Sequence, residues 1–213
     1  RCTGRECLRC SLHYRRPPQL WRWTGLLERQ LRHVDTFIAM SESSRDKHAE
    51  FGFPREMEVL PYFLPDPDGS EESRPSERPH ERPYFLFVGR LEKIKGLDDV
   101  IPAFADYRHA DLLIAGEGTH GAVLRELALG NERVRFLGHC EQDELKRLHD
   151  HALALVVPSE CFETFGITLI ESFRWRVPVI ARRVGPLPEI VDRAQAGLTF
   201  DGVDELLVAL RRI

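Results

Sequence analysis

The chain has 213 residues, a formal net charge of −4 at pH 7 and 42% hydrophobic residues. This is the composition of an ordinary soluble protein with one or two domains. It contains no run of 18 or more apolar residues, which excludes a membrane-spanning helix. Three of the five cysteines lie within the first ten residues, unlike a secreted disulfide framework, so we expect a cytoplasmic protein. Because the chain begins with Arg1, we expect it to be part of a longer protein.

The first 34 residues form a basic region in which eight Arg stand against two Glu. Its closely spaced potential metal ligands are Cys2, Cys7, Cys10 and His13. The spacing matches no standard zinc finger and a second ligand pair is missing, so reduced thiols without a metal are the simpler interpretation. We therefore include no metal site in the prediction.

Apolar residues at helical spacing after Pro17 and Pro18 predict an amphipathic basic helix. They are Leu20, Trp23, Leu27, Leu31 and Val34. Such a helix can pack on its own domain, or it can make a peripheral contact with an anionic membrane surface.

Short elements and a linker follow this helix. The pattern predicts a strand at 35–40, a helix capped by Ser41 or Ser43, and a strand at 58–60. Residues 65–83 contain five Pro and no other apolar side chain. Such a segment cannot bury enough surface to offset its ordering entropy, so we expect a disordered linker.

From residue 84 onward, six apolar strand signals alternate with six helical patterns. The strands are expected at 84–88, 111–115, 134–137, 153–157, 177–181 and 198–200. The helices are expected at about 97–108, 120–129, 141–151, 166–175, 186–194 and 203–213. This alternation predicts an α/β domain with a Rossmann-like, doubly wound parallel sheet. Ligands of such sheets bind at the carboxyl ends of the strands, where the strand order reverses.

The segment after the fourth of these strands carries two carboxylates, Glu163 and Glu171, eight positions apart. Between them a helix begins near Gly166, and the free backbone N–H groups at its start suit a phosphate. Glu171 has apolar neighbours, and a buried carboxylate needs a partner. A phosphate site between two acceptors for hydroxyl groups indicates a nucleotide sugar. The alternative is one solvated helix residue and one loop residue.

The loop after the first strand carries two cations, Arg90 and Lys95, between Gly89 and Gly96. The two glycines permit tight backbone turns. An Arg can bind two oxygens of a departing diphosphate, and a Lys adds a point charge. The alternative is a solvated basic loop.

The G-R-x4-K-G segment at 89–96 and the E-x7-E segment at 163–171 resemble the motifs of the family-four retaining glycosyltransferases, which have the GT-B fold. The resemblance covers about residues 35–213. It implies that residues 84–213 are the donor-binding domain and that residues 1–64 are a remnant of the N-terminal acceptor domain. It further implies a UDP- or GDP-linked sugar as donor, a sugar or lipid-linked acceptor, and no required cofactor.

The same resemblance assigns roles to individual residues. Arg90 and Lys95 stabilise the leaving diphosphate, Glu163 orients hydroxyls of the donor sugar, and Glu171 holds those of the ribose. The remaining donor-binding residues are Gly89, Gly116, His139, Phe165, Gly166, Ile167 and Thr168. Most of the acceptor domain is missing, so we expect this chain alone to transfer little or no sugar.

Two other functions remain open. An NAD-dependent oxidoreductase would use Gly116-x-Gly118-x-x-Gly121 as a dinucleotide fingerprint, with Glu141 as a ribose ligand. This fingerprint follows the second strand rather than the first, and it leaves the two cations and the paired carboxylates without a role. The other function is a non-catalytic nucleotide-binding module whose basic region contacts a partner. No DNA- or RNA-reading motif supports nucleic acid as that partner.

Overall fold

The computed structural model describes residues 11–12, 17, 24–65 and 77–213. The first part of the expected amphipathic helix and residues 66–76 of the expected linker lie outside these ranges. So do the potential metal ligands Cys2, Cys7, Cys10 and His13. Within the described residues, every helix is too short or too polar to cross a bilayer.

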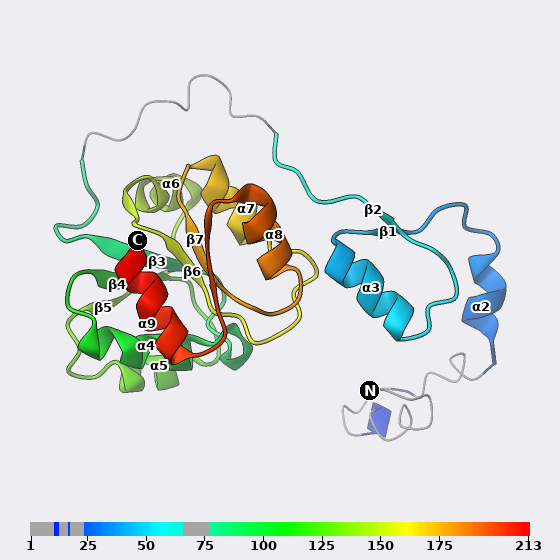
Figure 1. Cartoon of the computed structure of the whole chain (residues 1–213). Coiled ribbons are helices and arrows are strands. Elements are labelled where there is room, and N and C mark those ends of the chain that lie inside the picture. The colour runs from blue at the N-terminus through cyan, green and yellow to red at the C-terminus, as the bar shows by residue number, and fades with distance from the viewer. Residues whose placement is uncertain (1–10, 13–16, 18–23, 66–76) are drawn as a thin grey trace.

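A six-stranded parallel sheet forms the centre of residues 77–213 (Figure 1). Its strands are β3 (Tyr84–Val88), β4 (Asp111–Ala115), β5 (Val134–Gly138), β6 (Leu155–Val157), β7 (Val179–Arg182) and β8 (Gly197–Phe200). They lie in the order β5-β4-β3-β6-β7-β8. The order reverses between β3 and β6, which pair directly. The loops after these two strands therefore open side by side at the carboxyl edge of the sheet.

Helices cover both faces of this sheet. They are α4 (Leu97–Asp106), α5 (Gly121–Leu127), α6 (Gln142–His151), α7 (Ile167–Arg174), α8 (Leu187–Ala194) and α9 (Val203–Arg212). Alternate residues of β3 face opposite sides. Phe85 packs in the core cluster with α4, α5 and α9, whereas Leu86 packs with α6, α7 and α8. The doubly wound α/β architecture predicted from the sequence is confirmed.

The boundaries of these elements differ from the predicted ones by at most two residues. One such difference is the start of β7, which was expected at 177 and lies at Val179. The Val177 N–H donates to the Ser172 carbonyl oxygen at 3.0 Å, and Pro178 has no N–H to give to the sheet. This segment therefore closes the end of α7 before the chain enters the sheet.

The described residues before the sheet form short elements. They are α2 (Leu26–Leu31), β1 (Ile38–Ala39), α3 (Glu42–Glu50) and β2 (Glu58–Val59). β1 and β2 pair in parallel. Of the two expected caps, Ser41 is the one used, because its hydroxyl accepts the Ser44 N–H at 3.0 Å. α3 lies next to α8, one of the helices that cover the six-stranded sheet (Figure 1).

Three aromatic rings hold α4 on its face of the sheet. Phe85, Phe104 and Tyr107 lie edge to face, with ring centroids 5.8–5.9 Å apart. Phe104 is fully buried, and the Tyr107 hydroxyl donates to the Leu210 carbonyl oxygen at 3.0 Å, which ties α4 to α9. These three rings thus belong to the core cluster on the face of the sheet that α4, α5 and α9 cover.

Replacement of Phe104 by Ala should lower the free energy of unfolding by about 3–5 kcal/mol, because it removes a buried ring and leaves a cavity. Urea denaturation measures this change. Phe63 provides the matched control, since its side chain is 82% exposed. Phe63→Ala should change the free energy of unfolding by less than about 0.5 kcal/mol. Equal losses in the two variants would contradict the assigned core.

Candidate functional site

The loops that follow β3 and β6 pack directly on each other. The first of them forms a short 3₁₀ helix, Lys93–Lys95, and turns at Gly96 with φ of 71°. A Cβ at Gly96 would lie 2.1 Å from the Pro158 carbonyl oxygen, so only glycine fits there. The Glu160 N–H also donates to the Ile94 carbonyl oxygen at 2.9 Å. The loop with the predicted cations is therefore fixed against the loop with the predicted carboxylate.

This packing brings Lys95 to Glu163. The Lys95 Nζ lies 2.6 Å from the Glu163 Oε1, and the Ser159 hydroxyl donates to the same oxygen at 3.0 Å. Burial alone would raise the pKa of Glu163. The hydrogen bonds from Lys95 and Ser159, together with the Lys95 charge, outweigh it and hold the pKa below its usual value. Glu163 is thus an ionised acceptor at neutral pH, and its second oxygen remains available to a ligand.

The start of α7 lies just beyond Glu163. Phe165 is buried in the core and holds the chain before the helix. Gly166 is the N-terminal flanking residue, with φ of 101°, and a Cβ there would lie 2.8 Å from the Leu187 Cδ2 atom. The helix then begins at Ile167, and the first N–H groups of a helix have no partner inside it. Those of Ile167 and Thr168 are therefore donors at the mouth of the site, with the partial positive charge of a helix N-terminus.

Glu171 lies one turn further along α7 and is half-buried. Its carboxylate makes no hydrogen bond or ion pair with any residue of the described ranges. Burial raises the pKa of its carboxyl group. A partly desolvated carboxylate without a partner costs stability, and this cost would be offset by a ligand that donates hydrogen bonds.

A cavity of about 320 Å³ opens at the carboxyl ends of β3, β4 and β5. It brings together four residues predicted from the sequence: Gly89, Arg90, Gly116 and His139. Five further lining residues were not predicted, and they are Val88, Ala115, Glu117, Cys140 and Leu145. Glu117 is a variable position of the G-x-G-x-x-G segment, and the others belong to no motif. Only their places at the ends of β3 and β4, just beyond β5 and on α6 could have indicated them.

The two predicted cations have different carboxylate partners. Arg90 lines the cavity but is 75% exposed, and its Nη1 lies 2.8 Å from the Glu92 Oε1. Lys95 is held by Glu163 instead. The exposed Arg90 pair contributes little to stability, so the guanidinium can turn toward an anion at low cost. The His139 side chain is similarly exposed, and its Nε2 lies 3.6 Å from the Glu141 Oε1.

The glycines of the G-x-G-x-x-G segment serve the packing of two loops. A Cβ at Gly116 would lie 1.9 Å from the Gly89 carbonyl oxygen, and one at Gly118 would lie 2.3 Å from that of Leu91. The His120 N–H donates to the same Leu91 oxygen at 2.9 Å. An N–H of the segment is thus used inside the protein rather than left for a pyrophosphate. The structure explains these glycines without a dinucleotide.

A second cavity, of about 280 Å³, is lined by Glu163. One wall is the loop before α7, with Phe162, Glu163 and Thr164, and the opposite wall is α3. Glu163 therefore faces the N-terminal part of the chain across this cavity.

The family comparison agrees with the two sequence motifs. Residues 68–212 match the family described as glycosyl transferases group 1. The chain belongs to this family. The match includes both the 89–96 and the 163–171 segments, so the resemblance stated from the motifs is confirmed.

Two curated relatives come from Mycobacterium tuberculosis. A GDP-mannose-dependent alpha-(1-6)-phosphatidylinositol monomannoside mannosyltransferase is 35% identical over 190 residues, which cover 79% of this chain and 49% of the relative. A glycogen synthase is 32% identical over 192 residues, which cover 83% of this chain and 46% of the relative. The chain thus spans about half the length of these relatives.

Solved structures support the same fold. The sucrose-phosphate synthase of Thermosynechococcus elongatus matches with a TM-score of 0.68 at 25% identity, over 83% of this chain and 48% of that one. The lipopolysaccharide glycosyltransferase WaaG matches with a TM-score of 0.67 at 21% identity, over 82% of this chain and 52% of that one. The fold of the group 1 glycosyl transferase described here is therefore that of the GT-B glycosyltransferases.

Replacement of Glu171 by Gln should stabilise the ligand-free protein and raise its Tm by roughly 1–3 °C at pH 7. The pKa of Glu171 is higher in the folded chain than usual, so the ionised group opposes folding at neutral pH. The gain should disappear as the pH falls below the ordinary pKa of a glutamate. Thermal unfolding at several pH values measures it.

Glu141→Gln is the matched control, because the Glu141 side chain is 88% exposed and its replacement should leave the Tm unchanged. A lower Tm in Glu171→Gln than in this control would show that Glu171 already has a stabilising partner in the protein.

Proposed function

We propose that the complete protein of which this chain is a part is a retaining glycosyltransferase that uses a nucleoside diphosphate sugar. The observation that carries the proposal is the contact of Lys95 with Glu163 at the mouth of α7. This contact joins a cation and a carboxylate just before the start of α7. Arg90, on the same loop as Lys95, lines the cavity with Gly89 and Gly116. A cation and the free N–H groups at a helix start can bind a diphosphate, and a carboxylate can accept hydrogen bonds from the hydroxyls of a sugar.

In this proposal the cavity at the ends of β3, β4 and β5 holds the nucleoside. The unpartnered Glu171 accepts hydrogen bonds from the ribose hydroxyls. Arg90, Lys95 and the N–H groups from Phe165 to Thr168 bind the diphosphate. An ammonium group has three donors, so Lys95 can hold Glu163 and still reach a phosphate oxygen. Glu163 accepts hydrogen bonds from the hydroxyls of the donor sugar.

The reaction breaks the bond between the anomeric carbon and the diphosphate oxygen. The acceptor oxygen attacks the same face that the diphosphate leaves, so the configuration is retained, and the acceptor proton passes to the departing diphosphate. Negative charge grows on the diphosphate in the transition state. Fixed cations and helix N–H groups directed at that charge stabilise it electrostatically.

The donor base and the acceptor are proposed as classes. The mannosyltransferase relative is named as dependent on GDP-mannose, and a solved structure of HepE that matches at 21% identity is titled as a complex with UDP and glucose. We therefore keep UDP- and GDP-linked donors. The acceptor is a sugar or a lipid-linked sugar, reached from the cytoplasm, with the basic residues 1–34 contributing a peripheral membrane contact.

Calorimetric titration of this chain should show weak binding of UDP or GDP and none of NAD. Replacement of Arg90 by Gln should weaken the binding by about tenfold, because a charge-assisted hydrogen bond to phosphate is lost. Arg108→Gln is the matched control, because Arg108 lines a cavity with Arg133 away from the carboxyl ends of the strands. NAD binding tighter than that of both nucleoside diphosphates would instead support an oxidoreductase.

In the complete enzyme, Lys95→Ala or Arg90→Ala should lower turnover by about 10²–10³-fold, because each removes stabilisation of the leaving diphosphate. Lys93→Ala, on the same 3₁₀ helix but exposed, should leave turnover within about twofold of the wild type. Steady-state transfer assays measure the three variants. Wild-type turnover in Lys95→Ala and Arg90→Ala would remove both residues from the mechanism.

A further inference from the structure

α3 lies against the 84–213 domain without an apolar face of its own. Its nine residues, Glu42–Glu50, are almost entirely polar, and none of them is buried. Hydrophobic burial by the helix itself therefore does not fix its place. Its N-terminus, however, makes polar contacts with the 84–213 domain.

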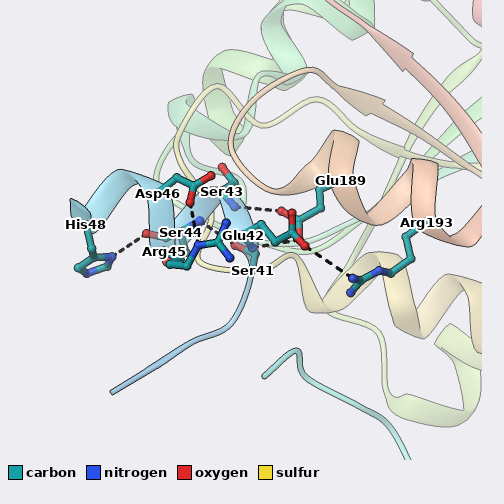
Figure 2. Close-up of polar contacts among 9 residues, drawn as sticks. All are labelled: Ser41, Glu42, Ser43, Ser44, Arg45, Asp46, His48, Glu189 and Arg193. Atoms are coloured by element: carbon teal, nitrogen blue, oxygen red, sulfur yellow. Dashed lines mark hydrogen bonds and ion pairs between the residues drawn. The ribbon is translucent and has the colours of Figure 1, made fainter. Parts of the chain in front are cut away.

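The carboxylate of Glu189, on α8, holds this N-terminus (Figure 2). The Glu42 N–H donates to its Oε1 and the Ser43 N–H donates to its Oε2, each at 3.0 Å. The two donors and the acceptor are about 147 positions apart in the chain. Both N–H groups belong to the first turn of α3, where they have no partner inside the helix and carry partial positive charge. Glu189 therefore satisfies two donors with one charged group.

The position of α3 determines the shape of the 280 Å³ cavity. Ser43, Ser44 and Lys47 form part of its helical wall, and Glu163 lies in the opposite wall. The Lys47 Nζ lies 5.2 Å from the centroid of the Phe162 ring, so the two walls are also in contact. Hydroxyls, a cation and aromatic rings therefore lie next to Glu163 in this cavity.

We propose that Glu189 is a positioning residue for the sugar half of the site. It fixes α3 through the backbone of Glu42 and Ser43, and α3 in turn supplies the wall that faces Glu163. This inference rests on the proposed function, because the cavity is taken as the place of the donor sugar. Its structural part, the attachment of α3 by Glu189, can be tested independently of any ligand.

Two apolar contacts near α3 offer another anchor. Met40 packs against the core cluster on the α8 side of the sheet, and the Tyr62 ring lies 5.6 Å from that of Phe165. They fix the segments before α3 and after β2. If they also fixed α3, removal of Glu189 would leave the helix in place, so the experiment has to separate the two anchors.

Hydrogen exchange of the α3 amides in this chain tests the attachment. Glu189→Ala should accelerate their exchange by at least about tenfold, because two charge-assisted hydrogen bonds are lost. Glu189→Gln retains one acceptor oxygen and should give an intermediate rate. Asp192→Asn, on the exposed side of the same helix, is the matched control and should exchange like the wild type. Unchanged exchange in Glu189→Ala would overturn the inference in favour of the Met40 and Tyr62 anchors.

Glu42→Pro provides the reciprocal variant. Glu42 is the first residue of α3, where proline is well tolerated, and the preceding Ser41 has the extended backbone that proline requires. The substitution removes one donor to Glu189. It also removes the Glu42 carboxylate, whose Oε1 lies 3.9 Å from the Arg193 Nη2, but both side chains are exposed and such a pair contributes little. As a single substitution, Glu42→Pro should accelerate exchange of the α3 amides. Combined with Glu189→Ala, it should accelerate exchange little beyond the rate of Glu189→Ala itself. Additive effects of the two changes would contradict a shared contact.

Affinity measurements test the positioning role. Calorimetry would compare UDP with UDP-glucose, and GDP with GDP-mannose, in the wild type and in Glu189→Ala. We expect nucleotide affinity within about twofold of the wild type, and a loss of most of the additional affinity that the sugar provides. A sugar-to-nucleotide affinity ratio equal to that of the wild type would overturn the inference. Failure of the wild type to bind any nucleotide would instead overturn the proposed function, with the exchange result unaffected.

Discussion

The close packing of the loops after β3 and β6 is the constraint on which the site depends. Gly96 can turn only because it has no side chain to meet the Pro158 carbonyl group. That turn directs Lys95 to Glu163, which is 68 positions away in the sequence. The parallel sheet provides the proximity, since its order reverses between these two strands. The backbone contact between the two loops therefore sets their relative position, and the ion pair between Lys95 and Glu163 forms as a result.

The two carboxylates of the E-x7-E segment have opposite electrostatic environments. Lys95 and Ser159 stabilise the charge of Glu163 and lower its pKa, whereas burial without a partner raises that of Glu171. Glu163 is thus oriented by the protein before any ligand arrives. Burial of the Glu171 carboxylate without a partner costs stability, and in the proposed site hydroxyl groups of a ligand would offset that cost. Such a cost is expected at a binding position, because a group already satisfied by the protein has less to gain from a ligand.

The sequence predicted the layers of the fold well, because strands buried on both faces and amphipathic helices leave regular patterns. It also predicted the two motif loops, since glycines and charged residues recur there at fixed spacing. It could not decide what Gly116 and Gly118 are for. Their role depends on the carbonyl groups that a Cβ would meet, and those belong to another loop. The Glu189 contact with α3 could not be predicted either. Its donors are backbone N–H groups, which every residue except proline has, so no residue type in the sequence marks them.

The polar character of the α3 attachment determines what it costs to break it. Separation of an apolar interface costs about 25 cal/mol for each Å² of apolar surface exposed to water, because water forms no compensating hydrogen bonds with that surface. Separation of Glu189 from the Glu42 and Ser43 N–H groups exposes donors and an acceptor that water can satisfy, so the net cost is about 1.5–3 kcal/mol for each charge-assisted bond. Because α3 has no buried residue of its own, breaking this contact exposes no core residue of the helix. The same contact that positions the wall facing Glu163 is thus one that can be broken reversibly.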